Sequence, residues 1–96
     1  MPPFMKWQVI DPAALHARTW DNEVVVYDAA SGNTHLLDTV TARVLATVAN
    51  TPADATVIAQ ALSQLWPEAP AELVHEQVDA MLAELAGISL ITPVAP

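Results

Sequence analysis

The residues of this chain that could take part in acid–base chemistry or metal binding are few. Three histidines and eleven acidic residues are spread over 96 positions. His75 and Asp79 are four residues apart in a helical pattern, so they share a helix face and could together contact a metal ion. Because neither an HExxH motif nor a second cluster accompanies this pair, we interpret it as a solvated face. His16 and His35 are accompanied only by scattered acids, and His35 is interpreted as a half-exposed strand residue beside a turn.

Composition excludes other kinds of reactive site. The chain has no cysteine, which rules out a thiol nucleophile, a zinc–cysteine site and a disulfide scaffold. Its two glycines, Gly32 and Gly87, are far apart, so there is no glycine-rich phosphate loop. We therefore expect no enzyme activity of the chain on its own, no metal and no cofactor.

The charge of the chain argues against nucleic-acid binding. Three Lys and Arg residues against eleven Asp and Glu residues give a formal net charge of −8. Nucleic-acid affinity comes largely from Lys and Arg contacts with phosphates. The last helix would be the recognition helix of a DNA-binding winged helix. It contains no Lys or Arg but does contain Glu72, Glu76, Asp79 and Glu84. The charge favours a basic or neutral partner, but taken alone it is explained more simply by acids that keep an apolar domain soluble.

Length and hydropathy predict one small globular domain over residues 1–96. The hydrophobic fraction is 53%, which excludes a disordered chain, and prolines crowd both ends. We expect the ends, about residues 1–5 and 92–96, to be loose. No apolar run approaches the ~18–20 residues that span a bilayer, and the start lacks a basic segment followed by an apolar one. The expected location is cytoplasmic, without membrane contact.

The first half of the chain has the composition of β-strands. Residues 6–10, KWQVI, predict a short strand or an extended arm that ends at Asp11-Pro12, since proline cannot donate to a strand ladder. Residues 13–19 are ambiguous. β-Branched and aromatic residues then predict a strand over residues 23–27.

The stretch VVVYDAASGNTHLLD, residues 24–38, predicts a hairpin. Gly32-Asn33 tolerates positive φ, so the chain can reverse and return through a third strand over residues 34–37. Val24 and Val26 face one way and Val25 and Tyr27 the other, so the second strand is apolar on both faces. Helices can cover one face only, and either a partner protein or the ends of the chain would cover the other.

The period of the apolar residues changes from two to about 3.6 at Asp38 and predicts three helices. Asp38 or Thr39 caps the first, Thr51 or Asp54 caps the second, and the third spans residues 71–86 with a left-handed cap at Gly87. The apolar stripes of the three helices are Val40, Val44, Leu45 and Val48; Ile58, Ala61, Leu62 and Leu65; and Val74, Val78, Met81, Leu82 and Leu85. The fold class is therefore α+β, with helices on one face of a three-stranded antiparallel sheet.

In the order and spacing of these predicted strands and helices, the chain resembles the PqqD-like peptide chaperones, also called RiPP recognition elements. The resemblance covers about residues 20–91 and includes Val25-Val26-Tyr27, Ser31-Gly32, Thr34-His35-Leu36-Leu37 and TARVLATV. It is most similar to the branch associated with HPr-kinase-related (HPr-rel-A) systems. The resemblance implies a winged-helix-like fold, three antiparallel strands followed by three helices. It also implies natural product biosynthesis, in which the chain holds the leader of a precursor peptide for a modifying enzyme.

In relatives with bound leaders, the peptide adds as a strand beside the third strand, in a groove walled by the third helix. Carried over to this chain, the resemblance implies a peptide-binding site formed by Thr34, His35, Leu36, Leu37, Leu73, Gln77, Ala80 and Met81. The residues agree with this, because an exposed strand edge usually carries Lys, Pro or a bulge and THLL has none of these. The alternatives are that THLL is a central strand, or that residues 88–91 cover its edge.

Other functions remain open at the level of the sequence. The chain could be an adaptor that docks on a pathway enzyme through the open sheet face and binds no peptide. It could also be a self-associating domain, with a homodimer as the partner.

Overall fold

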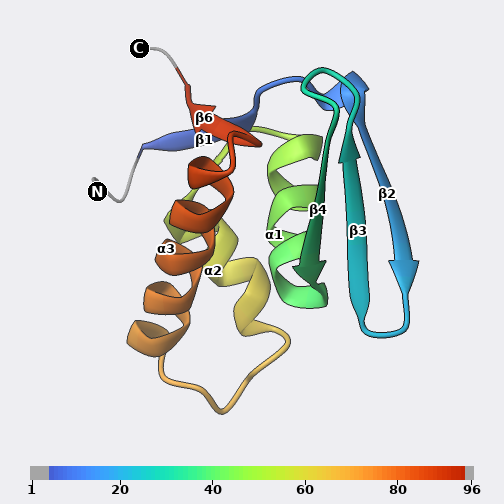
Figure 1. Cartoon of the computed structure of the whole chain (residues 1–96). Coiled ribbons are helices and arrows are strands. Elements are labelled where there is room, and N and C mark those ends of the chain that lie inside the picture. The colour runs from blue at the N-terminus through green and yellow to red at the C-terminus, as the bar shows by residue number, and fades with distance from the viewer. Residues whose placement is uncertain (1–4, 95–96) are drawn as a thin grey trace.

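The structure is a computed structural model that describes residues 5–94 of the chain. A three-stranded antiparallel sheet stands beside three helices, and a second small sheet joins segments from both ends of the chain (Figure 1). The main sheet contains β2 (Leu15–Trp20), β3 (Glu23–Asp28) and β4 (Asn33–Asp38). The small sheet contains β1 (Lys6–Val9), β5 (Ala53–Asp54) and β6 (Ile91–Pro93). The helices are α1 (Thr39–Asn50), α2 (Ala55–Ser63) and α3 (Ala71–Gly87), with a 3₁₀ turn at Pro12–Ala14. The predicted α+β class is confirmed.

The predicted hairpin over residues 24–38 is confirmed as β3 and β4. The two strands pair antiparallel from Glu23 opposite Asp38 to Asp28 opposite Asn33. In the connecting turn the Asp28 carboxylate accepts hydrogen bonds from the Ala30 N–H and from the Ser31 hydroxyl, each at 3.0 Å. Gly32 has φ +79°, a conformation that glycine adopts without a steric penalty.

The first strand of the main sheet is not the one expected. Residues 6–9 do form a strand, β1, but it pairs with β5 and β6 and not with the hairpin. The ambiguous segment supplies the third strand instead, because Trp20 and Glu23 pair across the two-residue turn Asp21-Asn22, with Asp21 at φ +55°. Closing a two-residue turn orders far less chain than bringing residues 6–10 to the hairpin, so the local pairing wins.

The predicted N-terminal caps are confirmed at Asp38 and Asp54. The Asp38 carboxylate accepts from the Thr41 N–H at 2.7 Å, and the Asp54 carboxylate accepts from the Val57 N–H at 2.9 Å. Each cap satisfies a backbone donor that the first helical turn leaves without a partner. Because Asp38 ends β4 and also begins α1, the cap fixes the angle between the strand and the helix.

The predicted left-handed cap at Gly87 is wrong, since that residue is the last of α3. The left-handed residue is Ser89, at φ +63°. The Leu90 N–H donates to the Leu85 carbonyl and the Ser89 N–H donates to the Ala86 carbonyl, both at 3.1 Å. These two bonds form a Schellman motif, which turns the chain from α3 into β6. Leu90 and Ile91 can then enter the core.

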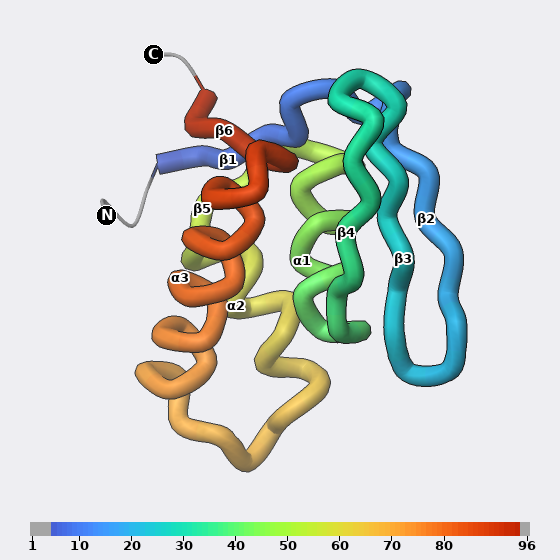
Figure 2. Tube along the Cα trace, in the orientation of Figure 1, coloured from blue at the N-terminus to red at the C-terminus, as the bar shows by residue number. Residues whose placement is uncertain are grey.

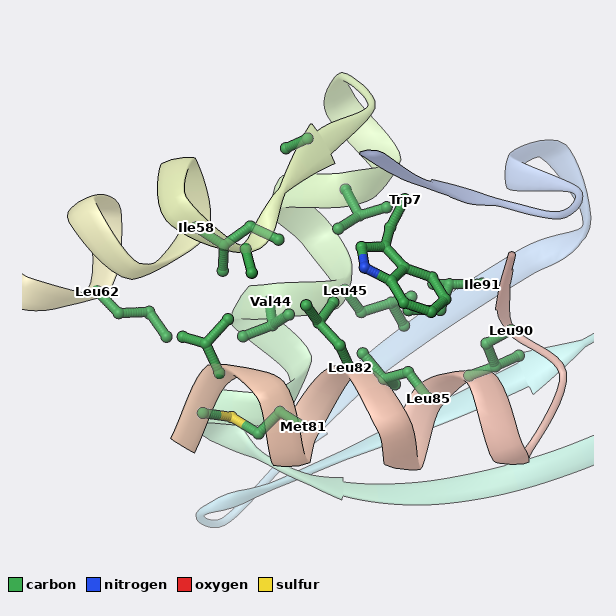
Figure 3. Close-up of a cluster of buried hydrophobic side chains, with 14 of the residues drawn as sticks. Trp7, Val44, Leu45, Ile58, Leu62, Met81, Leu82, Leu85, Leu90 and Ile91 are labelled. Atoms are coloured by element: carbon green, nitrogen blue, oxygen red, sulfur yellow. The ribbon is translucent and has the colours of Figure 1, made fainter. Parts of the chain in front are cut away.

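The hydrophobic core lies between the three helices and the inner faces of both sheets (Figure 3). The stripe predicted for α3 is confirmed in full, and in α1 Thr41 is buried while Val40 is only half-buried. In α2 the prediction is wrong at two positions: Ala61 and Leu65 are exposed. Leu65 follows the end of α2, and the buried row of this helix is Ala55, Ile58, Ala59 and Leu62.

Parts of both ends that were expected to be loose contact the rest of the protein. Met5 packs on the core, and Thr92 and Pro93 pair with β1 as part of β6, so that β1 and β6 run side by side (Figure 2). The remaining residues of those ranges, 1–4 and 95–96, lie outside the described residues. No helix between residues 5 and 94 has the length and apolar character required to cross a membrane.

Candidate functional site: the edge of β4 and the groove along α3

β4 is an edge strand with one free side. The order of the main sheet is β2-β3-β4, so within residues 5–94 β4 pairs only with β3. The two alternatives for this strand are thereby resolved, because it is not central and the C-terminal segment pairs with β1 instead of covering it. Alternate residues of an antiparallel edge strand direct their N–H and C=O groups away from the sheet. Such groups can pair with an added strand.

α3 lies opposite this edge, and cavities follow one another along it. At the start of β4, a cavity of about 480 Å³ lies between His35 and the C-terminal end of α3, Gly87 to Ser89. At the other end of β4, a cavity of about 400 Å³ lies between Asp38 and the middle of α3. A third cavity, of about 310 Å³, adjoins the first turns of α3. We refer to this row of cavities as the α3 groove.

The four predicted site residues of β4 divide between the two faces of the sheet. Leu37 faces inward and is 3% exposed, so it belongs to the core and contributes only its backbone to the edge. His35 also faces inward and lines the first cavity; its Nε2 atom is buried without a hydrogen-bond partner. Thr34 and Leu36 are exposed on the outer face, where Leu36 is 62% exposed. Of these four residues only His35 presents its side chain to the groove, together with Asn33 and Asp38 at the two ends of the strand.

The four predicted site residues of α3 all line the groove, but not the same cavity. Gln77, Ala80 and Met81 face the end of β4 in the second cavity. Leu73 lines the third cavity with Trp66 and Gln77, beyond the end of the strand. Three of the predicted residues therefore lie at the end of β4 and the fourth lies beyond it, whereas Gly87 is the α3 residue that shares a cavity with His35.

Several residues of the groove were not predicted. Glu84 lines the second cavity one turn beyond Ala80, and Gly87 lines the first. The spacing of three or four residues that joins Gln77 to Ala80 continues to Glu84 and Gly87, so the same helical periodicity would have found them. Trp66 could not be found in this way, because it lies in the irregular segment between α2 and α3.

The outer face of the main sheet is exposed and apolar. Trp20 is 75% exposed, Leu36 62% and Tyr27 44%, and the antiparallel register places all three on the same face. Arg18 lies among them, next to Val25. The expected alternation of β3 is confirmed, since Val26 on the inner face is 1% exposed. No segment within residues 5–94 covers this face. The parts of the chain ends that the structure describes are therefore excluded as its cover, and a partner protein remains.

The residues considered for metal binding do not form a larger cluster. His75 and Asp79 are one turn apart on α3 and both are partly buried. Within residues 5–94 no group of three or more His, Asp or Glu side chains is placed to hold a metal ion. His16 stacks on Tyr27 on the outer face, with ring centroids 6.4 Å apart.

Two solved structures have a similar fold. A structure described as TbiB1 in complex with the TbiA(beta) leader peptide matches with a TM-score of 0.72 and 21% identity, covering 93% of this chain and 99% of that one. A structure described as lasso peptide synthetase B1 complexed with the leader peptide matches with a TM-score of 0.69 and 16% identity, covering 91% of this chain and 98% of that one. At these identities the similarity establishes the fold.

A comparison with curated protein sequences gives no significant match. The family model described as Coenzyme PQQ synthesis protein D (PqqD) matches residues 23–91. This range begins at β3 and ends at the start of β6, so it includes the free edge of β4 and all of α3. The chain belongs to the PqqD family.

Proposed function

We propose that this protein is a non-catalytic peptide chaperone that binds the leader of a precursor peptide and presents it to a modifying enzyme. The observation that carries the proposal is the free edge of β4 facing the α3 groove. Membership of the PqqD family supports it, as do the two similar structures, each described as a complex with a leader peptide. The leader would add as a strand beside β4, with alternate side chains in the groove.

The length of the groove limits the bound segment. From Leu73 to Gly87, fourteen steps of α3 at about 1.5 Å each extend about 21 Å. An extended peptide rises about 3.3 Å per residue, so about six residues fill this length. β4 itself has six residues. The edge and the groove are therefore similar in length, although the Leu73 end of the groove lies beyond the strand.

Main-chain pairing alone gives little net affinity. About three residues of β4 face the edge, which allows about six hydrogen bonds, at about 0.5–1.5 kcal/mol net each. Their sum, about 3–9 kcal/mol, is offset by about 6–12 kcal/mol for ordering six peptide residues. Side chains in the groove must then supply the affinity. We expect Gln77, Ala80 and Met81 to contact them at the end of β4, and Leu73 beyond it.

Titration of isotope-labelled protein with the candidate precursor peptide, followed by NMR, tests the proposal. Strand addition should shift the backbone amides of residues 34–37 and of α3 residues that line the groove. A peptide that carries N-methyl groups at alternate amides is the matched control, because it keeps the side chains and loses the N–H groups that would donate to the edge of β4. Unperturbed amides at residues 34–37 with saturating peptide, or equal binding of the N-methylated peptide, would count against strand addition.

A second observation favours an enzyme as a further partner. The exposed apolar residues of the outer face, Trp20, Tyr27 and Leu36, lie on the opposite side of the sheet from α1, so a protein docked there leaves the groove open. We propose this face as the docking surface for the modifying enzyme. Replacement of Trp20 with Ser should weaken co-purification with that enzyme and leave peptide affinity unchanged. If the wild-type chain co-purifies without peptide and never binds one, the protein is an adaptor alone.

Self-association is the remaining use of the outer face. It predicts a dimer whose fraction rises with protein concentration in sedimentation or light scattering, and which Trp20→Ser abolishes. A chain of net charge −8 opposes its own association, so a heterologous partner is favoured. Assignment to the HPr-rel-A branch stays a prediction, which an HPr-kinase-like gene beside this one would support.

A further inference from the structure

The second cavity of the α3 groove combines negative charge with an apolar floor. It has a volume of about 400 Å³ and lies where β4 passes into α1. Two carboxylates, Asp38 and Glu84, line it from opposite sides, one at the end of the strand and one on α3. No Lys, Arg or His is among its lining residues. A cationic group placed there would meet two acids and no competing base.

The two carboxylates differ in how much of their charge is free. One Asp38 oxygen accepts the Thr41 N–H at 2.7 Å, and the positive end of α1 partly balances the charge of this residue. Glu84 lies in the last turn of α3, where no basic residue is present. The negative end of that helix adds to the Glu84 charge. Glu84 is therefore the main attraction for a cation.

Two carboxylates alone would not identify a ligand in so acidic a chain. The other residues that line the cavity narrow the class of ligand. Trp66, a residue that is 36% exposed, lines it as well, and Val40, Ala80 and Met81 contribute apolar surface. An indole face attracts a cation, and apolar walls suit the methylene stem of a long basic side chain. A small inorganic cation would gain nothing from the apolar walls. The lining fits Lys or Arg better than it fits a metal.

We propose that this cavity is the subsite for one Lys or Arg side chain of the bound leader segment. The inference rests on the proposed function and adds the chemistry that the groove selects. The basic side chain extends from the added strand beside the end of β4, with its stem on Met81 and its charge between Glu84 and the Trp66 ring. The subsite sets both the register of the peptide and its specificity.

Selection from a library of random twelve-residue peptides displayed on phage tests this proposal without knowledge of the natural leader. The full chain, immobilised, should enrich peptides with Lys or Arg at one fixed position of a shared motif. The same selection on Glu84→Gln should lose this preference. Glu76→Gln is the matched control, because Glu76 is an exposed acid on the same helix that lines none of the cavities described above.

Affinities of one selected peptide then give the size of the effect. Changing its basic residue to norleucine, which keeps the methylene stem, should weaken binding to the wild-type chain about 5- to 30-fold. The same change should have almost no effect on binding to Glu84→Gln. Trp66→Leu should reduce the preference for Lys or Arg over norleucine by a few fold, with a circular dichroism spectrum to show that it folds.

The outcomes separate this proposal from the proposed function. Selected peptides that shift the amides of residues 34–37 but show no basic position would overturn the subsite and leave strand addition intact. A basic preference that survives in Glu84→Gln would also overturn the subsite. Peptides that bind without shifting residues 34–37 would refute the proposed function, and the subsite with it.

Discussion

The cap that Asp38 provides for α1 should be the more costly of the two helix caps to remove. Its hydrogen bond joins the Asp38 carboxylate to the Thr41 N–H at 2.7 Å, and Thr41 is only 2% exposed. In Asp38→Ala this buried donor loses its partner and water cannot easily replace it. We expect a loss of about 1–2 kcal/mol in the free energy of unfolding.

The cap of α2 gives the comparison. Asp54 accepts from the Val57 N–H at 2.9 Å, but Val57 is 50% exposed, so water can reach this part of the helix. Asp54→Ala should cost about 0.5–1 kcal/mol. Thermal unfolding followed by circular dichroism should show a fall in Tm of about 4–16 °C for Asp38→Ala and about 2–8 °C for Asp54→Ala.

Asp38→Asn is the control that separates the hydrogen bond from the charge. Asparagine keeps an oxygen acceptor and caps helices about as well as aspartate, so this variant should stay within about 0.5 kcal/mol of the wild type. If Asp38→Asn loses as much stability as Asp38→Ala, charge and not the hydrogen bond stabilises the helix start. Equal losses for the two alanine variants would refute the role assigned to burial.

Three further predictions concern packing and backbone conformation. Leu82→Ala should lower the free energy of unfolding, measured in urea, by about 2–5 kcal/mol, because Leu82 is fully buried. Leu73→Ala, at a half-exposed position, should lower it by less than about 1.5 kcal/mol. Similar losses for the two variants would contradict the position of the core. Leu36→Lys should leave Tm nearly unchanged, whereas Leu37→Lys should prevent folding or lower the free energy of unfolding by more than about 4 kcal/mol, since only Leu37 lies in the core. The opposite result would show that β4 is shifted by one residue. Ser89 has φ +63°, a conformation that glycine adopts without strain. Ser89→Gly should therefore raise the free energy of unfolding by up to about 1 kcal/mol, and Ser89→Ala should not. A destabilised glycine variant would refute the Schellman assignment.

Features that depend on residues close in sequence were predictable. The caps at Asp38 and Asp54 and the buried stripe of α3 rest on contacts over three or four residues, and all of them are present. The alternation of β3 was also correct, with Val26 inside and Tyr27 outside. In the candidate site, Gln77, Ala80 and Met81, which the family resemblance implied, line one cavity together.

The errors arose where local patterns allow more than one outcome. Asp21-Asn22 is a tight turn with one residue at positive φ, but its polar sequence contains no glycine, so the strand before it was not recognised. Ser89, and not Gly87, adopts the left-handed conformation, because its position relative to the buried Leu90 sets where α3 ends. Trp66 enters the groove through an irregular segment that has no periodicity to follow.

Propensity, periodicity and composition act locally, so they were enough to predict the fold class, the hairpin, the helix starts and the acidic character of the protein. Whether the edge of β4 is free depends on contacts between distant parts of the chain. Val9 pairs with Ile91 across almost the whole chain, and no local pattern specifies so distant a partner. Because this pairing takes the C-terminal segment to β1, β4 keeps an unpaired edge beside α3, where we expect the peptide to bind.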